Sequence, residues 1–166
     1  MNPRIGNGFD VHALVAGRPL IIGGVRIPFD RGLEGHSDAD VLLHAIADAI
    51  LGALALGDLG AHFPDTEARW KDADSLRLLS HVAGLMASTD YTIGNVDATV
   101  VAEAPRLAPF IAAMRTNVAT AVGCNIVHIS IKATTTERLG FTGRGEGIAA
   151  FASVLLVPIE RDGSRG

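Results

Sequence analysis

An Asp-x-His pair near the start of the chain is the first place where residue types and spacing suggest chemistry. Asp10 and His12 lie two positions apart in a segment of alternating polarity, so both side chains leave the same face of an expected strand. Gly6 and Gly8 share that face and carry no side chain, which predicts open space beside the pair. A carboxylate and an imidazole beside open space are candidate metal ligands.

A second polar group lies on an expected helix of otherwise apolar sequence. Asp40, His44 and Asp48 recur at every fourth position and therefore share one stripe of that helix. Charges in such a stripe need partners if they are buried, and a metal ion held by Asp10, His12 and His44 is the economical one. Three protein ligands leave the fourth position of a tetrahedral zinc ion open, as in catalytic zinc sites.

We expect one of the two helix carboxylates to hold the other ring nitrogen of His44. The residues alone leave an alternative open, in which the helix is simply capped and His44 is a hydrogen-bonded core residue.

Two further segments have the composition of anion-binding loops. Residues 35–38 (Gly-His-Ser-Asp) precede the helix, where Ser37 and Asp38 suit ordinary capping and backbone N–H groups also suit a phosphate. Residues 133–137 place three threonines before Glu137, and residues 140–147 contain four glycines. Such segments let an oxyanion approach closely, and Glu137 is a candidate ligand for a hard cation. Each segment alone is equally typical of a helix cap or a strand end.

The intervening sequence must supply the elements that position these residues. Apolar periodicity and turn residues predict strands at residues 4–14, 20–22, 25–27, 91–102, 126–133 and 147–157. They predict helices at residues 37–56, 75–87 and 108–122, the first ending at Gly57 and the last at Gly123. The interleaving of strands and helices around a hairpin predicts an α+β fold. The continuously apolar strand at residues 147–157 is expected to be buried.

Composition limits the class of protein. The chain has 166 residues, of which 48% are hydrophobic and 19% charged, so we expect a single domain over residues 1–160 with a disordered tail at 161–166. The net charge of -4 predicts no general attraction to nucleic acid or to a membrane surface. The single cysteine, Cys124, forms no internal disulfide and suggests a cytoplasmic location. Few aromatic residues beside many apolar ones suggest that some apolar surface is buried between subunits.

Taken in order, the motifs resemble a known enzyme family. They read IGNGFDVH at residues 5–12, HSDADVLLH at 36–44, GDLG at 57–60, FPDT at 63–66, GNVD at 94–97, ATTTE at 133–137 and GFTGRGEG at 140–147. This set resembles the 2-C-methyl-D-erythritol 2,4-cyclodiphosphate synthases of the non-mevalonate isoprenoid pathway, from about residue 4 to residue 159.

The resemblance implies a mixed β-sheet covered by helices on one face and a homotrimer around the sheets, with active sites between subunits. It implies the substrate 4-diphosphocytidyl-2-C-methyl-D-erythritol 2-phosphate, whose 2-phosphate attacks the β-phosphorus so that CMP leaves and a cyclic diphosphate forms. It also implies one zinc ion per site on Asp10, His12 and His44, and magnesium or manganese on Glu137, bridging the diphosphate. His36 and Thr135 match the catalytic residues that stabilise charge in the transition state.

The resemblance also implies a set of substrate contacts. Asp58 and Gly60 match positions at the erythritol moiety, followed by a mobile loop of Phe63, Pro64, Asp65 and Thr66. The cytidine pocket matches Ala102, Pro105, Arg106, Leu107 and Ala108, together with Ala133, Thr134 and Thr135. The remaining implied contacts are Asp10, His12, His36, Ser37, Thr136, Phe141 and Arg144. Many members have Lys-Met-Leu in place of Arg106-Leu107-Ala108, which suits contacts made by the backbone there.

Two other functions remain open from the residues. One carboxylate and two histidines also form the facial triad of non-haem iron oxygenases, although that function gives the threonine and glycine segments no role. The second alternative function is that of a trimeric nucleotide-binding module without catalysis, although such a module does not need a metal ion with an open position. Ring closure needs no protein nucleophile, which agrees with the lack of a serine or cysteine nucleophile motif in the sequence.

Overall fold

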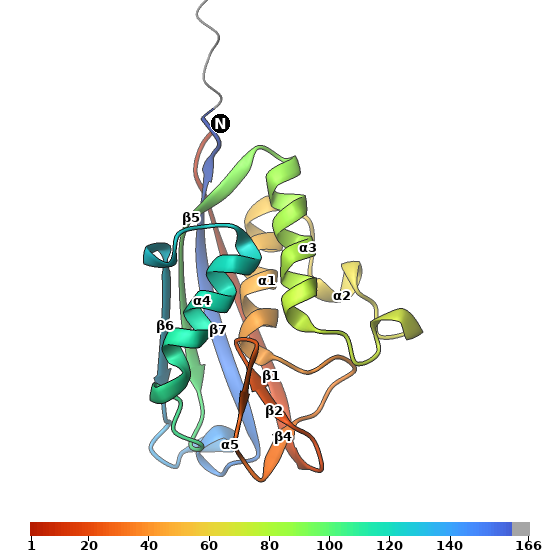
Figure 1. Ribbon diagram of the computed structural model, residues 1–166, viewed down its shortest axis with the longest axis vertical. Coiled ribbons are helices and arrows are strands. Elements are labelled where there is room, and N and C mark those ends of the chain that lie inside the picture. Colours follow the sequence, from red (N-terminus) through yellow and green to blue (C-terminus); the bar gives the residue numbers. More distant parts are fainter. Residues whose placement is uncertain (161–166) are drawn as a thin grey trace, which may run out of the picture.

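A five-stranded mixed sheet forms the centre of the computed structural model, which describes residues 1–160 (Figure 1). Its strand order is β4-β1-β7-β5-β6, and only the β5–β6 pair is parallel. The strands are β1 (Arg4–Ala16), β4 (Arg31–Leu33), β5 (Tyr91–Val101), β6 (Ile129–Thr134) and β7 (Gly147–Pro158). The predicted hairpin pairs β2 (Leu20–Ile22) with β3 (Val25–Ile27) across a turn of two glycines, Gly23 and Gly24, which both have positive φ.

Three long helices cover one face of the sheet, as Figure 1 shows. They are α1 (Val41–Leu54), which packs directly on β1 and β7, α3 (Ser75–Ser88) and α4 (Ile111–Val122). The short elements are α2 (Leu59–His62), α5 (Gly140–Gly143) and the 3-10 turns η1 (Ala68–Trp70), η2 (Ala108–Phe110) and η3 (Ile126–His128). The α+β class and the helices on one face are as predicted.

The glycines of β1 have a role other than the one predicted. A Cβ added at Gly6 would lie 1.8 Å from the carbonyl oxygen of Ala49, and one at Gly8 would lie 1.8 Å from that of Ala45. The space beside Asp10 is therefore filled by the backbone of α1, and the prediction of open space at the glycines is wrong. Glycine is required here because helix and strand approach too closely for any side chain.

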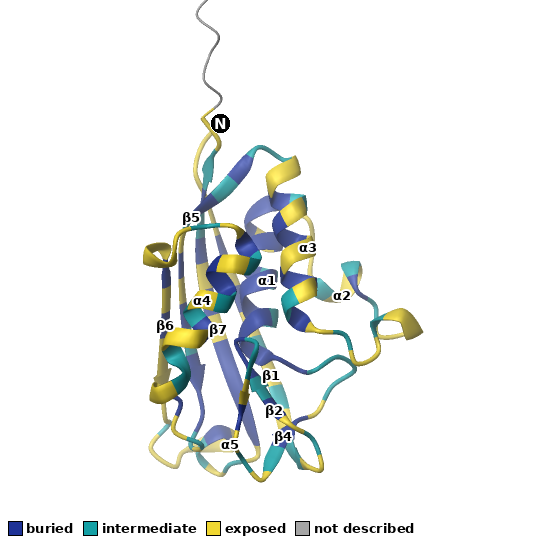
Figure 2. Ribbon diagram, viewed as in Figure 1, coloured by how far each residue is buried: buried dark blue, intermediate teal, exposed yellow. Residues whose placement is uncertain are grey.

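The opposite face of the sheet carries large exposed apolar side chains, and exposed and buried residues alternate along the strands in Figure 2. Ile5 is 74% exposed, Phe9 51% and Phe151 52%, and the rings of Phe9 and Phe151 lie 4.8 Å apart between neighbouring strands. In the strand predicted at residues 147–157, residues 147–150 are all buried, but from Phe151 on buried residues alternate with exposed or half-buried ones, so the prediction of a fully buried strand is wrong.

The first long helix begins and ends at residues other than those predicted. Its N-cap is the fully buried Asp40, whose side chain accepts hydrogen bonds from the backbone of Leu43 and also of Gly23 and Gly24. Ala55, in the left-handed conformation, ends the helix before Gly57 is reached. Asp40 therefore fixes the hairpin to the helix in addition to capping it.

One strand also begins later than predicted, and two further points complete the comparison with the sequence. The strand predicted from residue 126 begins at Ile129, because residues 126–128 form η3. No helix in residues 1–160 is long and apolar enough to cross a membrane. The predicted tail at residues 161–166 lies outside the described residues.

Candidate active site

Asp10, His12 and His44 meet where β1 faces the first turn of α1. The Asp10 Oδ2 atom lies 2.9 Å from His12 Nε2 and 3.0 Å from His44 Nδ1, and the two nitrogens are 3.2 Å apart. Their side chains are 12–25% exposed, so the cluster is accessible from one side. The structure thus brings together the three predicted metal ligands from positions 34 residues apart in the chain.

The surrounding hydrogen bonds orient both rings. His12 Nδ1 lies 2.7 Å from the carbonyl oxygen of Glu34, which only accepts, so this nitrogen carries a proton. His44 Nε2 lies 2.9 Å from Ser75 Oγ, and this hydroxyl donates its own proton to the carboxylate of Asp38, so it accepts from His44. In the neutral rings, the free lone pairs of both histidines therefore point at Asp10 Oδ2.

Three converging lone pairs repel one another unless a cation lies between them. The ligand atoms of a tetrahedral zinc ion are about 3.3 Å apart, close to the separations found here. Two imidazole nitrogens and one carboxylate oxygen are also a donor set that zinc prefers. The residues present therefore fit a metal ion.

The pKa values agree with a demand for positive charge. Burial raises the pKa of Asp10, but hydrogen bonds with His12 and His44 outweigh it and bring the pKa to about 2. Burial lowers the pKa of His12, but its hydrogen bond and attraction to Asp10 outweigh that effect and raise the pKa above its ordinary value. Without a metal, a proton on a histidine takes the place of the cation.

The partner of His44 is not the predicted one. Asp40 is occupied with capping, and Asp48 accepts from the backbone of Leu59 at 2.7 Å. Ser75, at the first position of α3, contacts His44 instead and links it to Asp38. The prediction that a helix carboxylate holds His44 is wrong, because both carboxylates have backbone partners of their own.

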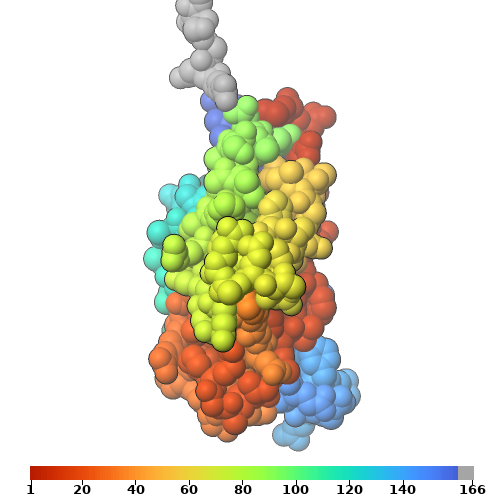
Figure 3. Space-filling model, turned by 90° about the vertical axis from the view of Figure 1, so that its right-hand side faces the viewer, coloured from red at the N-terminus to blue at the C-terminus, as the bar shows by residue number. Residues whose placement is uncertain are grey.

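A cavity of about 600 Å³ opens beside the cluster. The predicted site residues that line it are Asp10, His12, His36, Ser37, His44, Gly60, Phe63, Pro64, Asp65 and Thr66. Asp58 is not among the lining residues and caps α2, accepting from the backbone of Ala61. Figure 3 shows this side of the molecule, where the yellow segment around residues 60–70 projects above the orange loop that leads into α1.

Several wall residues were not predicted. These are Leu59, Trp70 and Leu78, whereas Gly35 of the predicted anion-binding segment and Asp48 of the polar stripe line the cavity as well. Trp70 packs edge-on against Phe63 at 4.8 Å between ring centroids. Apolar wall residues resemble core residues in sequence, so their role appears only when the segment of residues 59–72 is placed over α1.

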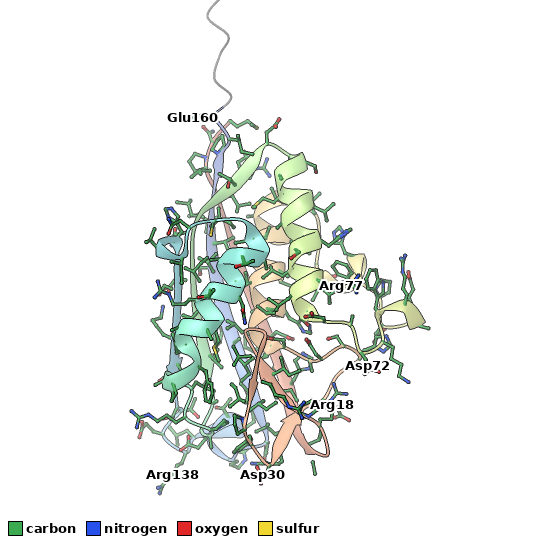
Figure 4. All side chains as sticks on the ribbon, viewed as in Figure 1. Arg18, Asp30, Asp72, Arg77, Arg138 and Glu160 are labelled. Carbon is green, nitrogen blue, oxygen red and sulfur yellow. The ribbon has the colours of Figure 1, made fainter. Side chains whose placement is uncertain are left out.

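The second group of predicted residues lies away from this cavity. None of the predicted residues between Ala102 and Arg144 belongs to its wall. In Figure 4, Arg138 marks their end of the molecule at the lower left, whereas Asp72 and Arg77 mark the cavity side at the right. One copy of the chain therefore carries two separate halves of the predicted site.

The second group of predicted residues, between Ala102 and Arg144, is held by hydrogen bonds within its own segments. Thr135 donates a hydrogen bond to Glu137 at 3.0 Å, and both side chains are exposed. Thr136 contacts Thr142 at 2.8 Å, which ties the threonine segment to α5. Within the predicted cytidine pocket, Ala102 and Leu107 are buried, at 7% and 3% exposure. Little surface of these two residues is therefore open to a ligand in a single copy of the chain.

Comparison with known proteins identifies close relatives. The sequence matches the YgbB family over residues 3–157. The 2-C-methyl-D-erythritol 2,4-cyclodiphosphate synthase of Geobacter metallireducens is 65% identical, covering 92% of this chain and 98% of the relative. Among solved structures, the bifunctional IspDF from Campylobacter jejuni is 43% identical with a TM-score of 0.92, over 96% of this chain and 43% of that one.

A further solved structure contains a nucleotide. IspF from Plasmodium falciparum, described as a CDP complex, is 34% identical with a TM-score of 0.85, over 96% of this chain and 98% of that one. These matches confirm the resemblance inferred from the seven motifs.

Proposed function

The chain belongs to the YgbB family and is an enzyme, and we propose that it converts 4-diphosphocytidyl-2-C-methyl-D-erythritol 2-phosphate into 2-C-methyl-D-erythritol 2,4-cyclodiphosphate. Relatives that match over nearly their whole length have the name of this activity. The observation that carries the proposal is the convergence of three ligand atoms, from Asp10, His12 and His44, on the wall of an open cavity. That arrangement suits a reaction on a polyanionic substrate.

The proposed reaction is an internal phosphoryl transfer. An oxygen of the 2-phosphate attacks the β-phosphorus, the bond from this phosphorus to the bridging oxygen breaks, and CMP leaves with that oxygen. The substrate provides the nucleophile, so the protein must hold two anionic groups in line and offset their repulsion. Bound at Asp10, His12 and His44, a zinc ion supplies Lewis-acid polarisation of a phosphate oxygen.

Residues beside the metal ligands are proposed to bind the phosphates. Gly35, His36 and Ser37 line the cavity next to His12 and His44. Within the described chain, the backbone N–H groups of these three residues have no hydrogen-bond partner, so they are free to donate to phosphate oxygens. The His36 ring is a further donor for charge that develops in the transition state.

The threonine segment is proposed to complete the site in a neighbouring copy. Across the sheet, Asp10 pairs with Ala150, Ala150 with Val100, and Val100 with Ala133. Asp10 and the start of the threonine segment therefore lie at the same level along the strands. Three strand spacings separate them, about 14 Å. Because β6 is an edge strand, a neighbour's Thr135 and Glu137 can reach the Asp10 side when sheets meet edge to edge. Glu137 is the proposed ligand for magnesium or manganese between the phosphates.

We propose a homotrimer with the active sites between subunits. Its support is the exposed apolar face of Ile5, Phe9, Val11 and Phe151, which a monomer would leave in water. A ring of three sheets turned inward covers that face and also joins the two half-sites. The cytoplasmic location inferred from the single cysteine stays a prediction.

Phosphorus NMR of the purified protein with the cytidyl diphosphate substrate, zinc and magnesium tests the function. We expect CMP and one cyclic diphosphate, formation that stops with a chelator, and no product from His44→Ala, which should also lose zinc. Tight substrate binding by a metal-loaded sample without release of CMP would reduce the protein to a nucleotide-binding module. Consumption of oxygen with iron would favour the oxygenase.

A further inference from the structure

Arg18, in the turn between β1 and β2, reaches the loop that carries His36. Its guanidinium donates from Nη1 to the carbonyl oxygen of Gly35 at 3.1 Å and from Nη2 to that of Ser37 at 2.7 Å. Its Nε is buried and has no partner among the described residues. Burying a donor without a partner costs free energy, so the two carbonyl contacts are what hold this side chain in place. Figure 4 labels Arg18 on the cavity side of the hairpin.

The two contacts belong to a longer series. The carbonyl oxygen of Glu34 accepts from His12 Nδ1 at 2.7 Å, and that of His36 accepts from the backbone N–H of Asp72 at 2.8 Å. Residues 34–37 therefore present four consecutive carbonyls to donors outside the segment. Arg18 supplies the donors for two of these four carbonyls.

Holding a carbonyl also fixes the N–H of the next residue. In a trans peptide the C=O and the following N–H point in opposite directions. When Arg18 holds the Gly35 carbonyl, the N–H of His36 points away from Arg18. Without Arg18, the Gly35–His36 peptide plane loses its only fixed contact within the described chain, next to a glycine that rotates easily.

We propose that Arg18 is a positioning residue, which holds the phosphate-binding backbone and the ring of His36 in the orientation that the reaction needs. The proposal rests on the function proposed above for the cavity. Arg18 does not line that cavity, so it acts through the segment of residues 34–37 and not by touching substrate. Only a planar fork spans two carbonyls in this way, because the lysine ammonium is a single compact point of charge.

Arg26 provides a matched control. It is exposed and lines the same cavity of about 570 Å³ as Arg18, and none of the candidate metal ligands lines that cavity. Within the described residues its side chain makes no hydrogen bond, so Arg26→Met removes the same charge without releasing a carbonyl. Arg18→Met keeps most of the side-chain volume, and Arg18→Lys keeps the charge and loses the fork.

The first test is steady-state kinetics on the full-length holoenzyme. We expect Arg18→Met to lower kcat by about 10- to 100-fold, since small displacements in an active site have such effects, with a smaller change in KM. Zinc content and thermal midpoint should match those of Arg26→Met, and Arg18→Lys should recover part of kcat. If kcat of Arg18→Met stays within twofold of wild type, or falls only in proportion to zinc or folded protein, the proposal is wrong.

The second test is independent of the reaction. Amide hydrogen exchange at Asp38 and Asp72, whose N–H groups donate to Ala73 and His36, reports opening of the segment. We expect at least tenfold faster exchange in Arg18→Met than in wild type or Arg26→Met. Unchanged exchange would overturn the positioning role even if kcat fell. Faster exchange in a protein that forms no cyclic diphosphate would instead place the error in the proposed function.

Discussion

At the scale of single residues, the ring of His44 is held from both sides. Its Nδ1 faces Asp10 and its Nε2 donates to Ser75, whose hydroxyl is bound to Asp38. Ser75 is 1% exposed, and Asp38 also accepts from its backbone N–H at 3.0 Å. The carboxylate thus acts on the candidate metal ligand through a serine, which fixes the tautomer and raises the basicity of the ring.

Replacing Ser75 should weaken metal binding without unfolding the chain. We expect Ser75→Ala to lower zinc affinity about tenfold, at the low end for such partners, because Ser37 Oγ lies 3.2 Å from the same nitrogen and partly substitutes. Competition with a chromophoric chelator measures this. Ser88→Ala, at the other end of α3, is the control, and equal affinities in the two variants would contradict the role of Ser75.

Because the pKa of His12 is raised, we expect the affinity for zinc to depend on pH. Metal binding requires His12 Nε2 without its proton, and the pKa of this group lies above its ordinary value of 6.5. Asp10, with a pKa of about 2, is ionised throughout the neutral range and does not compete. Zinc affinity should therefore already be falling as pH drops through 6.5, by about tenfold or more per unit below the His12 pKa. A flat affinity between pH 5.5 and 7 would be inconsistent with this.

At the scale of elements, the close approach of β1 and α1 sets the geometry of Asp10, His12 and His44. Because Gly6 and Gly8 have no Cβ, the helix backbone lies directly on the strand, and His44 reaches Asp10. Any side chain at Gly8 must push the helix away from the strand. The glycine pair is therefore part of the site although neither residue touches a ligand.

Gly8→Ala should lower the free energy of unfolding by about 3 kcal/mol or more, since it forces a backbone shift in a closely packed region. Gly84→Ala is the control, because this glycine is exposed within α3 and has no neighbour within 4 Å of an added Cβ. That substitution should stabilise the protein by about 0.5–1 kcal/mol. Urea unfolding at one fixed protein concentration compares the two. A loss under about 1 kcal/mol in Gly8→Ala would refute the packing argument.

The elements were largely predictable because apolar periodicity and glycine turns are local in the sequence. Periodicity did not predict which face of β1 points into the protein. Its glycines, Asp10 and His12 point inward while Ile5 and Phe9 point outward, the reverse of an ordinary half-buried strand. The three candidate metal ligands were predictable from spacing and residue type. Arg18 and Ser75 were not, because Arg18 binds backbone carbonyls, which have no sequence signature, and Ser75 lies 31 residues from His44.

At the scale of the whole molecule, the two half-sites and the apolar outer face have one explanation in common. A single copy leaves Thr135 and Glu137 exposed beyond an edge strand and Phe9 and Phe151 exposed on the sheet. Assembly of copies that joins the half-sites would also remove the aromatic pair from water. Under this arrangement, no subunit is active alone.

Mixing two inactive variants tests this arrangement directly. His44→Ala disables one half-site and Glu137→Ala the other, so each variant alone should be inactive. When both are co-expressed in equal amounts, a site is intact wherever a Glu137→Ala subunit contributes His44 and a neighbouring His44→Ala subunit contributes Glu137. Random assembly gives this pairing in about one quarter of sites, so we expect about one quarter of wild-type turnover.

The control mixture separates shared sites from simple stabilisation by co-assembly. His44→Ala and Asp10→Ala damage the same half, so every site in their mixture lacks one of the two ligands and turnover should not recover. If the first mixture were as inactive as the second while both assembled normally, no site would combine His44 of one subunit with Glu137 of another, and the shared-site arrangement would be wrong. If Glu137→Ala alone kept wild-type turnover, Glu137 would have no part in the site, because the strand register already places Ala133, where the threonine segment begins, about 14 Å from Asp10 in the same chain.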